Sequence, residues 1–128
     1  MVIKGTYIRN QYGQFKYDRP KFYAEVERQT GVRLEQGTLN IQCVPEDFVE
    51  IPEPSIRIEG LDQIDIDANQ FLRIGPCSIR GIQGFQILPV EKPNRKRGHH
   101  DDGIIEVSLE KTLDDLRGGE ELEVTFPG

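Results

Sequence analysis

Residues 78–89 read Ser-Ile-Arg-Gly-Ile-Gln-Gly-Phe-Gln-Ile-Leu-Pro. β-Branched and aromatic residues recur in this stretch between glycines, and a proline closes it, which is typical of β-structure bounded by turn residues. Similar runs lie on both sides of it, at residues 2–9, 38–44, 55–59, 63–67, 71–74, 104–109 and 122–126. We therefore expect a mainly β protein.

The spacing of these runs favours a small barrel or a sandwich, because short strands alternate with glycines and prolines throughout the chain. The 128 residues suffice for one hydrophobic core and are too few for two ordinary domains, so we expect a single domain over residues 1–128. Residues 50–75 are compatible with two strands or with mostly loop.

Two helices are expected between the strands. Asp18 is a candidate N-cap for a helix over residues 20–30, and Gly31 is its C-terminal stop. Leucines at 109, 113 and 116 recur at i, i+4 and i+7, which predicts a second helix before Gly118 and Gly119.

The charge and hydropathy of the chain disfavour several classes of partner. The formal net charge is −6 and the pI is near 4.9, which gives no general attraction to nucleic acid. No apolar run reaches the length of a membrane span, and the N-terminus lacks the apolar region of a signal peptide. We expect a cytoplasmic protein in which Cys43 and Cys77 are reduced, packed thiols.

Residues 35–41 hold the clearest candidate site. Thr38 and Asn40 are two residues apart on an expected strand, so their side chains share one face while Leu39 and Ile41 point to the other. A hydroxyl and an amide oxygen on one face suit a hard cation such as Mg²⁺, which takes further ligands from nucleotide phosphates. From spacing alone, both residues are better explained as outward-facing residues of a half-buried strand.

The order of motifs along the chain resembles that of the archaeal CTP-dependent riboflavin kinases. Residues 35–41, Glu-Gln-Gly-Thr-Leu-Asn-Ile, resemble the Gly-Thr-Leu-Asn signature of that family, which also follows a helix that ends in glycine. His100, followed six residues later by Glu106, is similar to its histidine and strand glutamate. Residues 5–8 resemble its first strand, and residues 118–124 its last turn and strand, so the likeness spans the chain.

This resemblance implies a closed six-stranded cradle-loop barrel that transfers the terminal phosphoryl group of CTP to riboflavin, giving FMN and CDP. It implies Mg²⁺ as cofactor, held by Thr38 and Asn40. Glu106 would position or deprotonate the accepting hydroxyl, and His100 and Glu106 would contact the flavin. The nucleotide contacts that it implies are Gly13, Tyr17 and Gly37.

The chain departs from the family after the first strand. Where the family has a glycine-rich stretch that packs against the nucleotide, residues 9–17 retain only Gly13. The alternative function is therefore a non-catalytic barrel that binds a flavin, a nucleotide or a protein partner. The identity of the donor, the acceptor and the oligomeric state stay open.

Residues 92–103 form a polar segment with three interpretations. It is an exposed polar loop, or it binds phosphate through its cations, or it holds a transition metal through residues 99–102, His-His-Asp-Asp. The cations are Lys92, Arg95, Lys96 and Arg97.

Overall fold

The structure is a computed structural model that describes residues 1–8, 19–35, 38–51, 54–59, 72–89 and 103–127. It contains seven strands, one α-helix and a single 3-10 turn in those residues. In chain order the elements are β1 Val2–Ile8, α1 Arg19–Thr30, β2 Leu39–Gln42, the 3-10 turn Pro45–Asp47, β3 Ile56–Ile58, β4 Leu72–Ile79, β5 Ile82–Pro89, β6 Ile104–Leu109 and β7 Glu121–Thr125.

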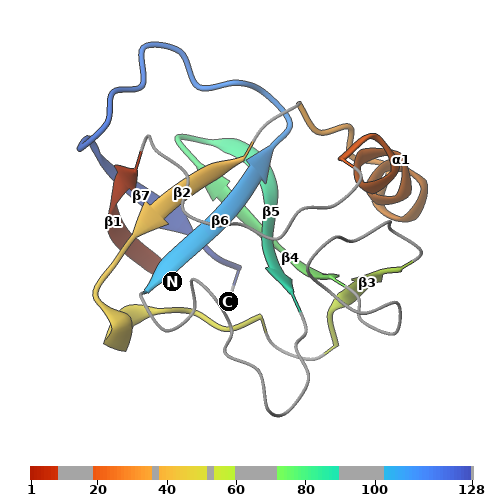
Figure 1. The fold of residues 1–128 in the computed structure, drawn as a ribbon, viewed down its shortest axis with the longest axis horizontal. Coiled ribbons are helices and arrows are strands. Elements are labelled where there is room, and N and C mark those ends of the chain that lie inside the picture. Colours follow the sequence, from red (N-terminus) through yellow and green to blue (C-terminus); the bar gives the residue numbers. More distant parts are fainter. Residues whose placement is uncertain (9–18, 36–37, 52–53, 60–71, 90–102, 128) are drawn as a thin grey trace.

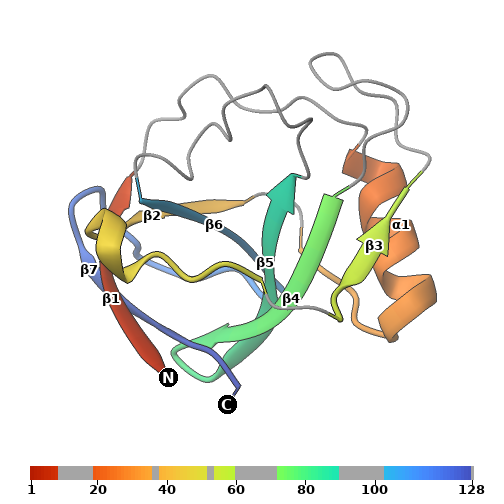
Figure 2. The same cartoon turned by 90° about the horizontal axis from the view of Figure 1, so that it is seen from below.

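Six strands close into an antiparallel barrel, which confirms the expected fold class. The sheet order is β3-β4-β5-β6-β2-β1-β7, and β4 also pairs with β7, so β3 alone lies outside the closed ring (Figure 1). The closing seam is short, with Ser78 opposite Thr125 and Ile79 opposite Val124. Both chain ends meet beside it, where the Phe126 amide donates to the Met1 carbonyl at 2.8 Å (Figure 2).

The barrel has an inner core and a second apolar layer outside it. The alternation of side chains places Leu122 and Val124 of β7 inward while their neighbours are exposed. The inner core consists of Ile41, Cys43, Cys77, Ile79, Ile105, Val107, Leu109, Leu122, Val124 and Phe126. The outer layer consists of Phe22, Val26, Leu34, Ile58, Leu72, Ile74, Phe85 and Ile87. Strand β4 contributes to both layers, with Cys77 and Ile79 in the inner core and Leu72 and Ile74 in the outer layer, which also holds Phe22 and Val26 of helix α1.

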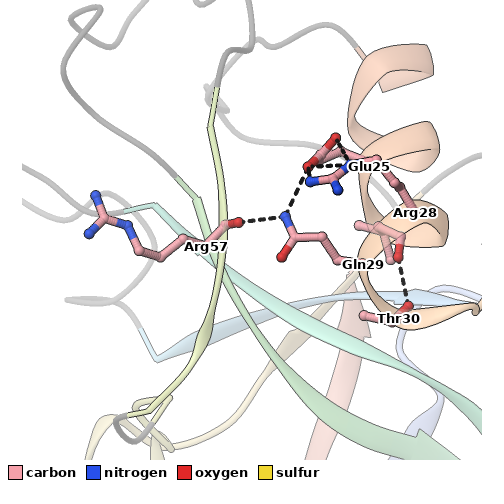
Figure 3. Close-up of polar contacts among 6 residues, drawn as sticks. Glu25, Arg28, Gln29, Thr30 and Arg57 are labelled. Carbon is pink, nitrogen blue, oxygen red and sulfur yellow. Dashed lines mark hydrogen bonds and ion pairs between the residues drawn. The ribbon is translucent and has the colours of Figure 1, made fainter.

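Helix α1 matches the expected helix. It buries Phe22 and Val26 completely in the outer layer, and it ends at Gly31, whose φ is 78° and whose amide donates to the Glu27 carbonyl at 2.8 Å. The Gln29 side chain donates to the Arg57 carbonyl on β3 at 2.9 Å, and Arg28 pairs with Glu25 (Figure 3). The helix is therefore tied to the outside strand by a side chain as well as by packing. The proposed cap, Asp18, lies outside the described residues.

The expected second helix is wrong. Leu109 ends β6, where its carbonyl accepts a hydrogen bond from the Glu35 amide at 2.9 Å, and residues 110–120 form bends and turns. Asp115 has φ 56°, which a right-handed helix does not allow. Leu113 and Leu116 pack against the inner core, so their helix-like spacing reflects a loop that covers one end of the barrel.

Two strand boundaries also differ from expectation. The run at 78–89 is a hairpin, because Arg80 and Gly81 both have positive φ, 52° and 78°, as in a tight two-residue turn. Gly75 and Pro76, which separate the expected strands at 71–74 and 78–89, lie within β4. Proline is tolerated there because this part of β4 lies between the segments paired with β3 and β7. The expected strand at 63–67 lies outside the described residues.

Candidate functional site

Strand β2 positions Asn40 with its side chain directed away from the inner core. Leu39 and Ile41 pack on that core, so Asn40 between them faces the outside of the barrel. Thr38 precedes the first residue of the strand and is half-buried. Asn40 is only 1% exposed, so this outward-facing residue of the half-buried strand is covered by neighbouring parts of the protein.

Strand β6 brings Glu106 directly opposite Asn40. The antiparallel register of β2 and β6 pairs Asn40 with Glu106 and Leu39 with Val107. Directly opposed residues share a face and have Cβ atoms about 4.5–5.5 Å apart. Glu106 is half-buried, and Asn40, Glu106 and Ser108 each have a polar or electrostatic contact with a neighbour. Asn40 and Glu106, which are distant in sequence, therefore lie side by side on neighbouring strands.

Ser108 belongs to the same face and was not singled out from the sequence. It lies two residues beyond Glu106 on β6, so the two side chains share one face of the strand. Its side chain is fully buried. The alternation of Glu106 and Ser108 with the apolar residues of 104–109 could have identified it, because both polar residues share the face opposite Ile105 and Val107.

One row of side chains crosses the outer face of the sheet. It is apolar at one end and polar towards the other. Its apolar half is Ile74 on β4 and Ile87 on β5, which belong to the layer beneath α1. Its polar half is Glu106 and then Asn40, before the row ends at Ile8 on β1. The polar residues therefore lie beside the surface that the helix covers.

The polar side chains near the start of β2 carry oxygen atoms of the types that bind hard divalent cations. Thr38 and Ser108 contribute hydroxyl oxygens, Asn40 an amide oxygen, and Glu106 a carboxylate, which are the ligand types that Mg²⁺ prefers. Within the described ranges, no group of three or more His, Cys, Asp and Glu side chains is arranged to hold a metal ion.

A pocket of about 340 Å³ lies at the end of the barrel next to Thr38, and we call it the barrel-end pocket. Its wall includes Thr38 and Leu39 at the start of β2, Tyr7 on β1, and Leu113 and Leu116 from the loop after β6. The candidate cation-binding face and this pocket therefore share one residue.

The other predicted site residues cannot be placed. The nucleotide residues Gly13, Tyr17 and Gly37 lie outside the described part of the chain. The same holds for the flavin residue His100, for residues 99–102 as a metal site, and for the phosphate-binding candidates Lys92, Arg95, Lys96 and Arg97. The roles predicted for these residues stay predictions.

Comparisons with known proteins give no relative: no family model matches the sequence, and no curated protein matches it. Among the described residues, α1 is the one α-helix, and it is too short to cross a lipid bilayer.

Proposed function

We propose that this protein transfers a phosphoryl group from a nucleotide, CTP by resemblance, to riboflavin in the presence of Mg²⁺, giving FMN. The observation that carries this proposal is the placement of Asn40 opposite Glu106, with Thr38 two residues away on the same side of the barrel. These are the three described residues to which the resemblance gives a metal-binding or catalytic role. The closed six-stranded barrel is also the fold that the resemblance implies.

The proposed roles follow from the chemistry of the side chains. Thr38 and Asn40 would hold Mg²⁺ through their oxygens, and the bound ion would neutralise charge on the transferred phosphoryl group. Glu106 carries a carboxylate that accepts the proton of the ribityl hydroxyl as its oxygen bonds to the γ-phosphorus. The bond from that phosphorus to the bridging oxygen breaks, and the nucleoside diphosphate leaves.

Such a sparse site is adequate for this reaction. Phosphoryl transfer depends mainly on alignment and on charge neutralisation, and it needs no covalent nucleophile from the protein. Burial strengthens electrostatic interactions, and Asn40 and Ser108 are two of the three buried polar side chains in the described residues. The third, Gln86, faces inward and donates to the Val49 carbonyl at 2.7 Å, so it belongs to the structural core.

A second candidate function rests on residues 9–17. The single glycine in this stretch favours a barrel that has kept a binding site and lost the donor loop. This protein would bind a flavin, a nucleotide or a protein partner without catalysis.

One assay separates the two. The protein is incubated with riboflavin, Mg²⁺ and each of CTP, ATP, GTP and UTP, and FMN is measured by chromatography with fluorescence detection. We expect FMN with at least one donor. Thr38→Ala, Asn40→Ala and Glu106→Gln should each lower the rate by about 100-fold or more, the size seen when one charge-stabilising group is removed.

The matched control is Gln42→Ala, which removes an exposed carboxamide two residues beyond Asn40 on the same strand. It should retain the wild-type rate. Circular dichroism establishes that each variant is folded. If no FMN formed with any of the four donors while riboflavin or a nucleotide bound measurably, the kinase hypothesis would be wrong and the non-catalytic barrel would be the supported function.

A further inference from the structure

Asn40 and Glu106 form a directly opposed pair on neighbouring strands. The register of β2 and β6 places the two residues opposite each other, and both strands lie side by side in the barrel wall (Figure 1). Directly opposed residues have Cβ atoms about 4.5–5.5 Å apart. Two oxygen ligands of one Mg²⁺ lie about 3 Å apart, because each is about 2.1 Å from the ion in near-octahedral geometry. The amide oxygen of Asn40 and one carboxylate oxygen of Glu106 can therefore reach the same ion.

The pairing of β2 and β6 does not include Thr38. Strand β2 begins at Leu39, and Thr38 lies directly before it. Glu106 is therefore the residue whose position relative to Asn40 is defined by the strand pairing.

Glu106 also supplies a negative charge to a row of side chains whose other members are uncharged. Those members are Ile74, Ile87, Asn40 and Ile8. A divalent cation held only by neutral oxygens would place uncompensated charge beside Asn40, which is 1% exposed. The carboxylate of the half-buried Glu106 offsets that charge, and the number of charged ligands is a main determinant of cation affinity.

The other contacts of these side chains are compatible with a bound ion. Asn40 and Glu106 each have a polar or electrostatic contact with a neighbour. An amide has two N–H donors besides its oxygen, and a carboxylate has two oxygens. Coordination through one oxygen of Glu106 leaves the other to accept the proton of a hydroxyl group.

We propose that Asn40 and Glu106 together bind a divalent cation before any nucleotide is present. The inference rests on the proposed function in taking Mg²⁺ as the ion, and it adds Glu106 to the ligands. If Thr38 and Asn40 were the only protein ligands, the ion would take its other ligands from nucleotide phosphates and would bind together with the nucleotide. The two arrangements therefore differ in whether the protein binds the ion alone.

The test is a titration of the full chain with Mn²⁺ in the absence of nucleotide. Mn²⁺ shares the oxygen ligands of Mg²⁺, and electron paramagnetic resonance measures the free ion. We expect wild-type protein to bind Mn²⁺ at concentrations up to millimolar, and Mg²⁺ to displace it. Glu106→Gln removes the charge and keeps the shape of the side chain, so it should weaken Mn²⁺ binding by about tenfold or more. Glu121→Gln, which removes a carboxylate at an exposed position of β7, is the control and should bind as the wild type does.

Asn40→Asp is a second variant, with the opposite expected effect. It adds a carboxylate opposite Glu106 without changing the shape of the side chain. It should strengthen Mn²⁺ binding by about tenfold, and Mn²⁺ should raise its melting temperature by more than that of the wild type. A purely structural role for Asn40 predicts neither gain. Circular dichroism establishes that each variant is folded.

Three results would overturn the proposal. They are no binding of Mn²⁺ to the wild type, equal affinity in the wild type and Glu106→Gln, and no gain of affinity in Asn40→Asp. Equal affinity in Glu106→Gln would place the ion elsewhere on the chain.

The titration does not require turnover, so its failure is distinguishable from failure of the proposed function. Binding of Mn²⁺ that depends on Glu106, without formation of FMN, supports the cation site and removes the kinase. Formation of FMN by a protein that binds Mn²⁺ only together with a nucleotide keeps the kinase and removes Glu106 from the ligands.

Discussion

Gly84 is the position at which a single methyl group should disturb the barrel most. It lies on β5 opposite Leu109 of β6 and is buried. A Cβ added to Gly84 would lie 2.7 Å from the Cα of Leu109 and closer still to the Ser108 carbonyl oxygen. The optimal separation of two carbons is about 3.5 Å, so the two strands would have to separate by roughly 0.8 Å at this point.

The expected cost is high because both obstacles are backbone atoms, which cannot rotate away as a side chain can. Overpacking of a core costs about 1–3 kcal/mol, and the upper end applies here. The separation also strains the hydrogen bond from the Glu110 amide to the Gln83 carbonyl, which is 2.8 Å long and lies at the end of the same strand pair. We expect Gly84→Ala to lower the free energy of unfolding by about 3 kcal/mol.

Urea denaturation followed by circular dichroism measures this change. With a slope of about 1.5 kcal/mol per molar urea, the midpoint should fall by roughly 2 M. Gly81→Ala is the control, because its added Cβ meets no atom within 4 Å and the cost is confined to its φ of 78°, about 1 kcal/mol. If Gly84→Ala were no less stable than Gly81→Ala, the close approach of β5 and β6 would be refuted.

Three further predictions concern side chains. Burial raises the pKa of the Cys77 thiol to about 12, so at pH 8 it should react with a thiol reagent only after unfolding, and rapid labelling of the folded protein would contradict this. Because its ordinary pKa is near 9, its contribution to stability is complete below about pH 9 and is lost as the pH rises towards 12; the decline of unfolding free energy over that interval should be shallower in Cys77→Ala. Gln86→Leu removes the donor to the Val49 carbonyl and should cost about 1–3 kcal/mol in urea denaturation, whereas Gln83→Leu, at an exposed position of the same strand, should change stability by less than about 0.5 kcal/mol. Gln29→Ala should lower the free energy of unfolding by no more than about 1 kcal/mol, and its effect should appear as faster amide hydrogen exchange in β3. Unchanged exchange in β3 would show that the Gln29 side chain does not hold the strand.

The parts of the fold that depend on local chemistry were predictable from sequence. Helix α1 ends at Gly31 because the left-handed conformation there favours glycine, and β6 and β7 follow the apolar runs that predicted them. The second helix was not predictable in this way. Leucines at 113 and 116 have the same spacing whether a helix face or a loop covers the core, and the periodicity alone does not distinguish the two.

The candidate site was predictable in part. The spacing of Thr38 and Asn40 predicted a shared strand face, whereas β2 begins at Leu39 and Thr38 lies directly before it. That Asn40 lies opposite Glu106 depends on the pairing and register of β2 and β6. A shift of one residue would have placed Asn40 opposite Val107 or Ile105 instead. The register is held because Ile41, Ile105 and Val107 must all face the inner core. The packing of apolar residues on one side of these strands thus decides which polar residues meet on the other.

Two of the polar residues on the outer face, Asn40 and Ser108, are as deeply buried as its apolar residues. On the apolar half of the same row, Ile74 and Ile87 are buried beneath α1, as expected for an outer layer. On the polar half, Asn40 and Ser108 are 1% and 0% exposed. Polar groups cost free energy when buried unless their hydrogen bonds are satisfied, and apolar residues would have continued the row without that requirement. Asn40 and Ser108 each have a polar or electrostatic contact with a neighbour, and these contacts offset the cost of their burial.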